Sequence, residues 1–485
     1  MASPSILDNY PDYEVNIGIE VHVQLNTKTK IFCRTANGTS QEPNTNICQV
    51  CCGYPGVLPV LNKKVVEYAI LVGLATNSKI SPKSFFARKH YFYPDLPKNY
   101  QITQGALPIC TEGNIEIKLE DNRKKIIRLI RIHMEEDAGK SLHSNMSNES
   151  FIDLNRTGTP LLEIVSYPDI SSSHEAKEYL KTLRSIVQYL GVCSGNMEEG
   201  AFRADTNISV RKKGATKLGT RCELKNINSF KFIGDAIEYE IERQITILEE
   251  GQQVIQQTRL WDEKNRKTIL MRSKEEAADY RYFNDPDLPV VEVDQNWITN
   301  IKNSMPELPN QKFERFIKEG LSPYEADILV NDIELANYYE STHKLNNSKQ
   351  VINWILRELL GYIKDSKITL LECKVTPEKL AKIVSLLESS KINNHAAKEV
   401  FDIVAETGEN PETIIKERGL EQIGSIDELE TIIKQIIDDN QKQVTQFKAG
   451  NEKLFGFFVG ESMKRTKGKG NPHLIQELLK KYLNN

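Results

Sequence analysis

A chain of 485 residues is too long for one hydrophobic core, so about three domains are expected. Its composition, 39% hydrophobic and 27% charged, is that of a folded globular protein and excludes a disordered chain. The net charge of −4 hides an asymmetry, because residues 444–485 carry +5 and the remainder −9, which suggests that a polyanion docks at the C-terminal end. No apolar run reaches the roughly 20 residues of a membrane span and no signal-peptide pattern opens the chain, so we expect a cytoplasmic protein without a membrane partner.

Strand patterns dominate the chain up to residue 293. Alternating apolar residues occur at 14–25, 114–120, 151–156, 206–211 and 289–293, and helical patterns at 174–191 and 232–251 lie between them. These patterns predict a mixed region of helices and strands over residues 1–293.

The run IGIEVHVQL at residues 17–25 predicts a strand with two unlike faces. Glu20, His22 and Gln24 share one face, because side chains two apart on a strand point the same way. The other face is apolar and can bury itself.

Residues 128–141, RLIRIHMEEDAGKS, place three acids at the end of another predicted strand. The carboxylates of Glu135, Glu136 and Asp137 repel one another unless solvent or a cation meets them. Taken alone, a solvated turn is the simpler interpretation, and a metal site is the alternative.

Two further strand patterns, at 197–210 and 218–229, carry polar residues at spacing two or directly after the strand. These residues are Arg203, Asp205, Asn207, Glu223, Lys225, Asn226 and Asn228. Each set alone fits a solvated sheet face equally well. Four such sets in one domain favour a nucleotide site, in which carboxylates, a histidine and amides hold Mg²⁺ while Arg and Lys hold phosphates.

The common phosphate-binding and hydrolase motifs are absent. DAGKS at 137–141 lacks the glycine that a P-loop needs, since Met134 stands there, and no G-x-G-x-x-G occurs. The chain also lacks a G-x-S-x-G motif and the Gly/Ser-rich loop of an amidase serine. A hydrolytic half-reaction would therefore need another chain.

After residue 293 the strand patterns stop. Apolar residues recur at helical spacing from 351 to 483, and several of these segments open on Thr, Asn, Asp or Pro. We expect two helical domains, at 294–400 and 401–485, the second being basic.

The motifs together resemble the B subunit of the aspartyl/glutamyl-tRNA amidotransferase. The resemblance rests, in chain order, on IGIEVHVQL, RKHYFYPDLPKNYQITQ, HMEEDAGKS, DLNRTGTPLLEIVSYPDI, MEEGAFRADTNIS, ELKNINSF, SKEEAADYRYFNDPDLP and FVGESMKRTKGKGNP. It implies an α+β fold, in which a cradle of mixed, largely antiparallel sheet similar to glutamine synthetase and guanido kinases precedes all-α domains. It also implies a heterotrimer with an amidase A subunit and a small C subunit.

The activity implied by the resemblance is amidation of misacylated tRNA, either Glu-tRNA(Gln) or Asp-tRNA(Asn). ATP with Mg²⁺ would phosphorylate the side-chain carboxylate, and ammonia from glutamine would displace the phosphate. An alternative is a non-catalytic subunit that docks tRNA and assembles the complex, and a free-standing ligase acting on a small acid is a third possibility.

The resemblance also assigns roles to individual residues. The implied catalytic and metal-binding group is Glu20, His22, Glu135, Glu136 and Glu223, with Lys225 as a further catalytic residue. Residues implied to line the nucleotide are Arg203, Asp205, Asn207, Asn226 and Asn228. Residues implied to contact tRNA or its aminoacyl end are Arg88, Tyr91, Tyr93, Asp95 and Tyr100, together with Lys464, Arg465, Lys467 and Lys469 in the tail. Without the resemblance, the Tyr-rich run would be interpreted as core packing and the basic run as a solvated face.

The cysteines at 33–52 suggest an incomplete zinc site. Cys48 and Cys51 form a C-x₂-C half-site, and Cys33 and Cys52 are further candidate ligands. Many members of the family have a second cysteine at the position of Thr35. A degenerate site with buried thiols is therefore the alternative to bound zinc.

Overall fold

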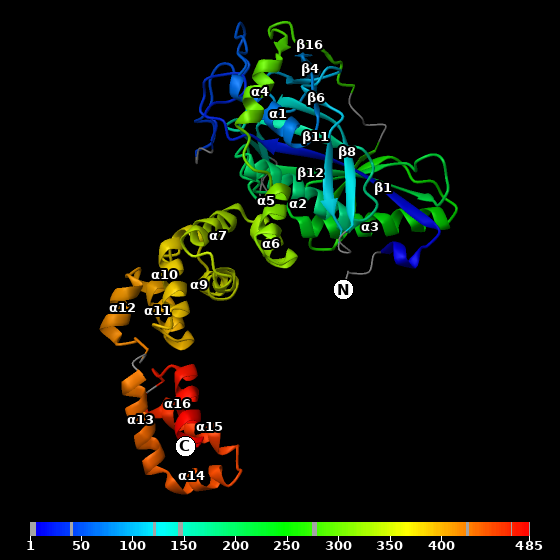
Figure 1. Cartoon of the computed structure of the whole chain (residues 1–485). Coiled ribbons are helices and arrows are strands. Elements are labelled where there is room, and N and C mark those ends of the chain that lie inside the picture. The colour runs from blue at the N-terminus through cyan, green and yellow to red at the C-terminus, as the bar shows by residue number, and fades with distance from the viewer. Residues whose placement is uncertain are drawn as a thin grey trace. The chain divides into compact units, whose positions relative to one another are not determined.

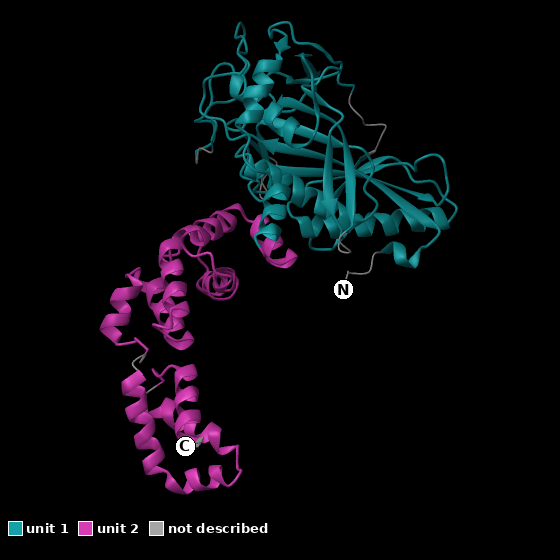
Figure 2. Cartoon of the chain, viewed as in Figure 1, with its two compact units in different colours: residues 1–319 teal, residues 320–485 magenta. Residues whose placement is uncertain are grey.

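The computed structural model describes residues 6–38, 42–119, 123–143, 149–273, 279–422, 426–466 and 468–484 (Figure 1). The chain forms two compact units, Met1–Glu319 and Gly320–Asn485 (Figure 2). None of the helices in the described ranges is both long and apolar enough to cross a bilayer.

The first unit is built on a ten-stranded sheet. The strands of this unit are β1 (Tyr13–Gln24), β2 (Lys79–Ile80), β3 (Lys83–Ser84), β4 (Phe86–His90), β5 (Tyr100–Gln104), β6 (Cys110–Thr111), β7 (Asn114–Lys118), β8 (Lys124–Glu136), β9 (Lys140–His143), β10 (Ser150–Asp153), β11 (Pro160–Ser166), β12 (Phe202–Lys212), β13 (Cys222–Lys225), β14 (Gln257–Asp262), β15 (Lys267–Ser273), β16 (Phe283–Asn284) and β17 (Val291–Glu292). The sheet runs β15-β14-β13-β12-β1-β11-β8-β6-β2, with β7 also paired to β8. Its strand pairs are antiparallel except β13 and β14, which are parallel.

Helices cover one face of this sheet. The helical segments of the first unit are η1 (Ile6–Asn9), α1 (Lys63–Ala75), α2 (Ser173–Tyr189), α3 (Phe230–Glu249), α4 (Gln295–Asn303) and α5 (Pro309–Lys318). Alternate residues of β1 are buried, and they share one core with apolar residues of α1, α2 and α3. Ser172 and Ser229 cap α2 and α3, since each hydroxyl accepts a hydrogen bond from a backbone N–H of the first turn. The other face of β1 is therefore left for the polar residues.

The second unit is helical. Its helices are α6 (Pro323–Val330), α7 (Ile333–Leu345), α8 (Gln350–Trp354), the π-helical segment η3 (Ile355–Leu359), α9 (Leu360–Ser366), the 3₁₀ segment η4 (Leu370–Glu372), α10 (Pro377–Glu388), α11 (Asn394–Thr407), α12 (Pro411–Arg418), α13 (Ile426–Asp439), α14 (Gln441–Lys448), α15 (Leu454–Arg465) and α16 (Pro472–Asn484). The helices α13 to α16 enclose an apolar core of their own, with Ile433, Phe458 and Leu479 fully buried.

The α+β fold class with a helical C-terminal region is confirmed. The first compact unit continues past residue 293 to Glu319. The physical reason is that α4 and the segment before α5 bury Ile301 and Leu308 in the core of the sheet unit. The predicted division of the helical region near residue 400 stays a prediction.

Candidate active site

Five polar side chains meet on the face of the sheet opposite the helices. They form the carboxylate–histidine cluster: Glu20 and His22 of β1, His133 and Glu135 of β8, and Glu163 of β11. His22 is the cross-strand partner of Glu163, which is in turn the partner of His133. Because cross-strand partners point to the same face of a sheet, the register itself brings this row together.

Glu163 and Glu135 each lie between the two histidines. Nε2 of His22 is 3.4 Å from Oε2 of Glu163 and 3.5 Å from Oε1 of Glu135. Nε2 of His133 is 3.2 Å from Glu163 and 3.7 Å from Glu135. The ligand atoms of His22, Glu135 and Glu163 all lie within 4.8 Å of one another. Two carboxylates and one imidazole at this spacing suit a divalent cation such as Mg²⁺, with further positions left for phosphate or water oxygens.

The cluster perturbs the titration of its own members. Burial alone would lower the pKa of His133, but Glu163 and Glu135 outweigh burial and raise it to about 9. Burial also lowers the pKa of His22, but Glu163 and Glu135 outweigh burial and leave this pKa raised. The two imidazoles hold the pKa of Glu163 well below its usual range despite its burial. Burial raises the pKa of Glu20, and repulsion from Glu163 adds to that rise. Such opposed shifts are typical of a functional site.

Two cavities meet at the cluster and share Glu20, Lys89 and Glu163. The basic cavity, of about 330 Å³, is further lined by Arg221, Lys225 and Arg272. The second cavity, of about 530 Å³, is lined by Thr103, Gln104, Gly105 and Ala106 among others. Burial lowers the pKa of Lys89, but the attraction of Glu135 and other neighbours outweighs it and leaves the pKa raised. Lys89 is therefore a cation held at the junction of the two cavities.

Lys225 lines the basic cavity and lies between two carboxylates. Its Nζ is 2.7 Å from Oδ2 of Asp205 and 3.1 Å from Oε1 of Glu223. The other oxygen of Glu223 accepts a hydrogen bond from Thr258 Oγ1 at 2.9 Å. Glu20 accepts a bond from Nδ2 of Asn207 at 3.3 Å, which connects this group to the cluster. The predicted residues Asn207, Glu223 and Lys225 thus line one cavity with Glu20 and His22.

Glu136 does not join the cluster in which the sequence placed it. Side chains alternate along β8, so that Ile132, Met134 and Glu136 turn toward the core while His133 and Glu135 face the cavities. There Glu136 forms an ion pair with Lys98, and its Oε1 accepts a hydrogen bond from the backbone N–H of Ile102 at 2.9 Å. The grouping of Glu135 with Glu136 is therefore corrected, because adjacent residues on a strand point to opposite faces.

Several other predicted residues lie outside the two cavities. Arg203 donates to Oδ2 of Asp137 at 2.9 Å, an atom that also accepts a bond from Gln24 at 3.0 Å. Asp137 is thus a buried acceptor that ties β1 and β12 to the end of β8. Asn226 and Asn228 follow β13, are exposed and line neither cavity. The left-handed backbone of Asn226, with φ +61°, indicates a turn role.

The Tyr-rich run lies beside the cluster. Tyr91 contacts Tyr93 and Tyr280, with ring centroids 5.9 and 6.2 Å apart, and the side chain of Tyr93 is exposed. Arg88 is held by Asp285 and Asp287, at 2.9 and 2.7 Å, and stacks over Tyr100. Asp95 accepts a hydrogen bond from Gly139 through its backbone oxygen. Exposed rings remain available to stack on a base, whereas Arg88 serves to hold the 285–287 segment.

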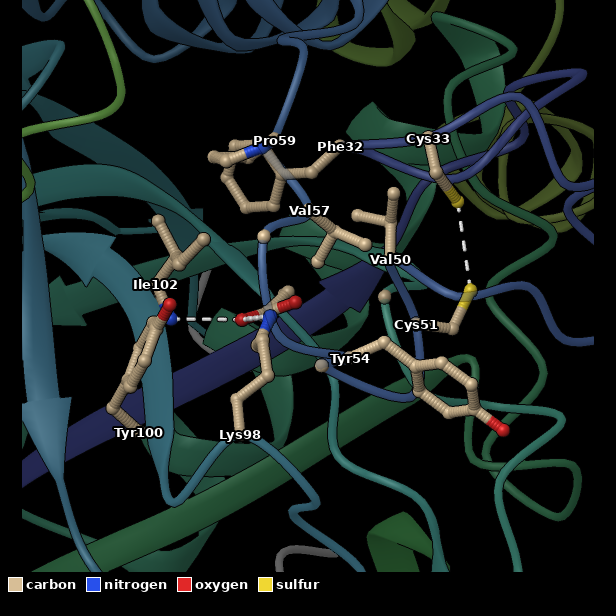
Figure 3. A pocket seen from close by; sticks show the side chains of 14 residues that line it. Phe32, Cys33, Val50, Cys51, Tyr54, Val57, Pro59, Lys98, Tyr100 and Ile102 are labelled. Carbon is tan, nitrogen blue, oxygen red and sulfur yellow. Dashed lines mark hydrogen bonds and ion pairs between the residues drawn. The ribbon is translucent and has the colours of Figure 1, made fainter.

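The predicted zinc ligands form a group of three sulfurs. Cys51 Sγ is 3.5 Å from Cys33 Sγ (Figure 3) and 3.7 Å from Cys48 Sγ, and Cys52 stands outside the group. The Thr35 hydroxyl lies 3.7 Å and the Lys30 ammonium 3.6 Å from the same Cys51 sulfur. A structural zinc site needs four ligands, and a buried ammonium repels a metal cation. These residues therefore do not fit a structural zinc ion, and the sulfurs are not assigned as its ligands.

The basic residues of the tail differ in their surroundings. Lys464 is exposed at the end of α15, while Arg465 forms ion pairs with Asp439 and Glu461. Lys469 is partly exposed. Lys467 lies outside the described residues.

Sequence reasoning missed several residues that line the cavities, among them Lys89, His133, Glu163, Arg221 and Arg272. A signal existed for three of these. His133 precedes Glu135 by two positions on one strand, and Glu163 lies in an apolar strand where a carboxylate needs a partner. Arg221 stands two positions before Glu223, at the spacing that predicted Glu223 and Lys225. Lys89 and Arg272 lie in separate segments, so only the fold could unite them with the site.

Comparison with known proteins gives a consistent result over nearly the whole chain. Residues 15–299 match the GatB/GatE catalytic domain, and residues 337–483 match the GatB domain. The B subunit of the aspartyl/glutamyl-tRNA(Asn/Gln) amidotransferase from Thermodesulfovibrio yellowstonii is 52% identical over 473 residues, covering 97% of this chain and 99% of its own length. Proteins of the same name from Syntrophotalea carbinolica and Persephonella marina are 52% and 50% identical, with 97% of this chain and 98% and 100% of theirs covered.

Proposed function

The chain belongs to the family of aspartyl/glutamyl-tRNA(Asn/Gln) amidotransferase B subunits, and on this premise we propose that its first unit phosphorylates and then amidates a tRNA-bound carboxylate. The enzyme to which it contributes is a glutamine-hydrolysing ligase that acts in translation. The substrate is Glu-tRNA(Gln), Asp-tRNA(Asn) or both.

One observation carries the proposal. Two cavities meet at a cluster of carboxylates and histidines. Arg221, Lys225 and Arg272 line the basic cavity, whereas Thr103, Gln104 and Arg131 line the second. Phosphoryl transfer needs a donor and an acceptor placed in line with cations between them, and little else from the protein. The basic cavity suits the phosphates of ATP, and the second cavity suits the aminoacyl end of the tRNA.

The residues then have separable roles. Arg221, Arg272 and Lys225 hold the phosphates of ATP. Lys89, at the junction, binds oxygens of the acceptor carboxylate and of the transferring phosphoryl group. Glu20, His22, Glu135 and Glu163 would hold Mg²⁺, which would supply positive charge against the transferring phosphoryl group.

Ammonia completes the reaction on the activated carboxylate. Phosphorylation turns the carboxylate oxygen into a leaving group, and ammonia attacks the acyl carbon as phosphate departs. The ammonia comes from glutamine hydrolysed by an amidase A subunit, with a small C subunit completing a heterotrimer. A separate amidase fits the sequence, which lacks a G-x-S-x-G motif and an amidase-type serine loop of its own.

Both units contribute residues that bind the tRNA. Exposed Tyr93 offers a ring on which the terminal base can stack. Lys464 and Lys469 of the second unit contact backbone phosphates, which gives affinity without base readout.

The decisive experiment measures ADP release by the reconstituted heterotrimer with ATP, Mg²⁺ and ammonium. We expect release with Glu-tRNA(Gln) and none with uncharged tRNA, including when the glutaminase is blocked. Glu135→Gln should abolish release, while Glu14→Gln, a carboxylate of β1 paired with Arg211 outside the cluster, should not. Amide formation at the unchanged rate in Glu135→Gln with tRNA still bound would show that this chain only docks tRNA and assembles the complex. ADP release without any tRNA would instead indicate a ligase for a small acid.

A further inference from the structure

Lys30 is a fully buried lysine beside Cys51, the central member of the group of three sulfurs. Its side chain is 0% exposed, and its Nζ donates to the backbone oxygen of Asn46 at 2.9 Å and to Cys51 Sγ at 3.6 Å. Within the part of the chain that the structure describes, Lys30 makes no ion pair with a carboxylate. A buried charge needs a counter-charge. The sulfur of Cys51 is the group placed to supply it, as a thiolate.

The other sulfurs are within reach of the same atom. Cys33 and Cys48 lie 3.5 and 3.7 Å from Cys51 Sγ, and Figure 3 shows Cys33 and Cys51 pointing toward one another. A hydrogen bond from the Cys33 thiol lowers the pKa of Cys51, and the charge of Lys30 lowers it further, although burial opposes both effects. Cys33 and Cys51 also line a cavity of about 200 Å³ with Val50 and Tyr54. A small polar oxidant can therefore reach the sulfurs, although Cys51 itself is buried.

We propose that Cys51 is a peroxide-reactive thiolate that forms a disulfide with the neighbouring sulfur of Cys33. A thiolate beside a cation, reached through a cavity and next to a second thiol, is the arrangement of a redox-active cysteine. Thr35 places a hydroxyl, not a fourth sulfur, beside Cys51, and Lys30 supplies the positive charge at this group.

The reaction balances with hydrogen peroxide as the two-electron oxidant. The Cys51 thiolate attacks one peroxide oxygen and breaks the O–O bond, giving a sulfenic acid and a hydroxide that takes up a proton. The Cys33 thiol then attacks the sulfenic sulfur, so that the S–S bond forms as the S–O bond breaks and water leaves. Two thiols lose two electrons, and one peroxide becomes two waters.

The experiment is peptide mapping of the heterotrimer after treatment with hydrogen peroxide. Trypsin cleaves after Lys30, Arg34 and Lys63, so Cys33 lies in one short peptide and Cys51 in the next. We expect these two peptides to become linked with the loss of two hydrogen masses, and dithiothreitol to release them. Cys51→Ser should abolish the link, whereas Cys52→Ser, which removes an adjacent thiol outside the group, should leave it. Lys30→Met should slow the reaction about tenfold, because the thiolate loses its cation.

Two results would overturn the proposal. The first is one equivalent of zinc per chain in the purified complex that Cys51→Ser removes, since this would make the sulfurs metal ligands. The second is oxidation of Cys52 in preference to Cys51. If Lys30→Met does not fold, the rate of linkage in the wild type between pH 5 and 8 decides instead. A rate that stays nearly flat supports a thiolate already formed, whereas a rise of about tenfold per pH unit indicates an ordinary thiol and contradicts the proposal.

Discussion

Glu135 and Glu136 are neighbours on β8, yet their carboxylates lie on opposite faces of the sheet. Oε2 of Glu135 accepts from Thr103 Oγ1 at 3.1 Å, and Oε1 of Glu136 accepts from the N–H of Ile102 at 2.9 Å. Adjacent residues of β5 thus bind the two acids, Thr103 binding Glu135 and Ile102 binding Glu136. Glu135 lines the second of the two cavities at the cluster, whereas Glu136 lines the separate cavity of about 200 Å³ beside Cys33 and Cys51.

This division predicts opposite effects of two conservative changes. Glu136→Gln leaves the ammonium of Lys98 buried without its partner, so we expect a loss of roughly 3–5 kcal/mol in the free energy of unfolding. Glu135→Gln should lower the rate of amidation about 100-fold or more with a smaller effect on stability. Urea unfolding and single-turnover amidation distinguish the two.

A double variant tests the cause of the Glu136 effect. Lys98→Met together with Glu136→Leu removes both charges and should recover most of the lost stability. If Glu136→Gln instead keeps full stability and loses activity, Glu136 takes part in catalysis.

The titration of His133 predicts a pH dependence of stability in the metal-free protein. The pKa of His133 is raised to about 9 in the folded state and is about 6.5 in the unfolded chain. The folded state therefore binds the proton more tightly. The resulting stability is fully present below pH 6.5 and is lost as the pH rises through 9. The free energy of unfolding in chelator should fall by roughly 3 kcal/mol at most between these values, and His133→Gln should flatten the profile. If the free energy of unfolding of His133→Gln changes with pH as steeply as that of the wild type, another group takes up the proton.

A buried hydrogen-bond network around Glu240 connects helix α3 to the strands that line the basic cavity. Glu240 of α3 is 0% exposed and accepts hydrogen bonds from Arg243, Gln244 and Thr268. Thr268 also accepts from Arg259 of β14, at 2.8 Å, and so ties the β14–β15 pair to the helix. Because β14 carries Thr258, which lines the basic cavity, Glu240→Gln should cost roughly 3–5 kcal/mol of stability and raise the KM for ATP. Glu242→Gln on the same helix is the matched control. Unchanged unfolding and KM in Glu240→Gln would contradict this support role.

The two basic residues at the end of α15 should contribute differently to tRNA binding. Lys464 is exposed, whereas Arg465 is engaged by Asp439 and Glu461. Lys464→Ala should weaken tRNA binding and reduce the slope of log K against log salt by about 0.7–0.9, the value for one lost phosphate contact. Arg465→Ala should change the slope less. Equal slopes for Lys464→Ala and the wild type, measured by filter binding over a range of about 50 to 200 mM salt, would remove Lys464 from the interface.

Strand periodicity predicted which face of β1 carries Glu20 and His22. The spacing of Glu20 and His22 placed them on one face of β1, and the structure has them on the face opposite the core. The grouping of Glu136 with Glu135 was wrong, because adjacent acids on a strand cannot share a face, and the pairing of His133 with Glu163 decides which of them faces the cavities. Lys89 and Arg272 could not be found by spacing, since each comes from a segment apart from the predicted strands of the site.

The sequence by itself determined the α+β class, the helical C-terminal region and the two-faced character of β1, because these depend on periodicities of neighbouring residues. It also carried the family, through motifs spread over the whole chain. Only the tertiary structure decided which charges meet. Pairing of β1 with β11 and of β11 with β8 sets His22, Glu163 and His133 in one row, and such pairings join residues far apart in the chain. The spacing of the cysteines indicated that Cys33, Cys48 and Cys51 could group, but only the fold of the loop places Lys30 beside Cys51.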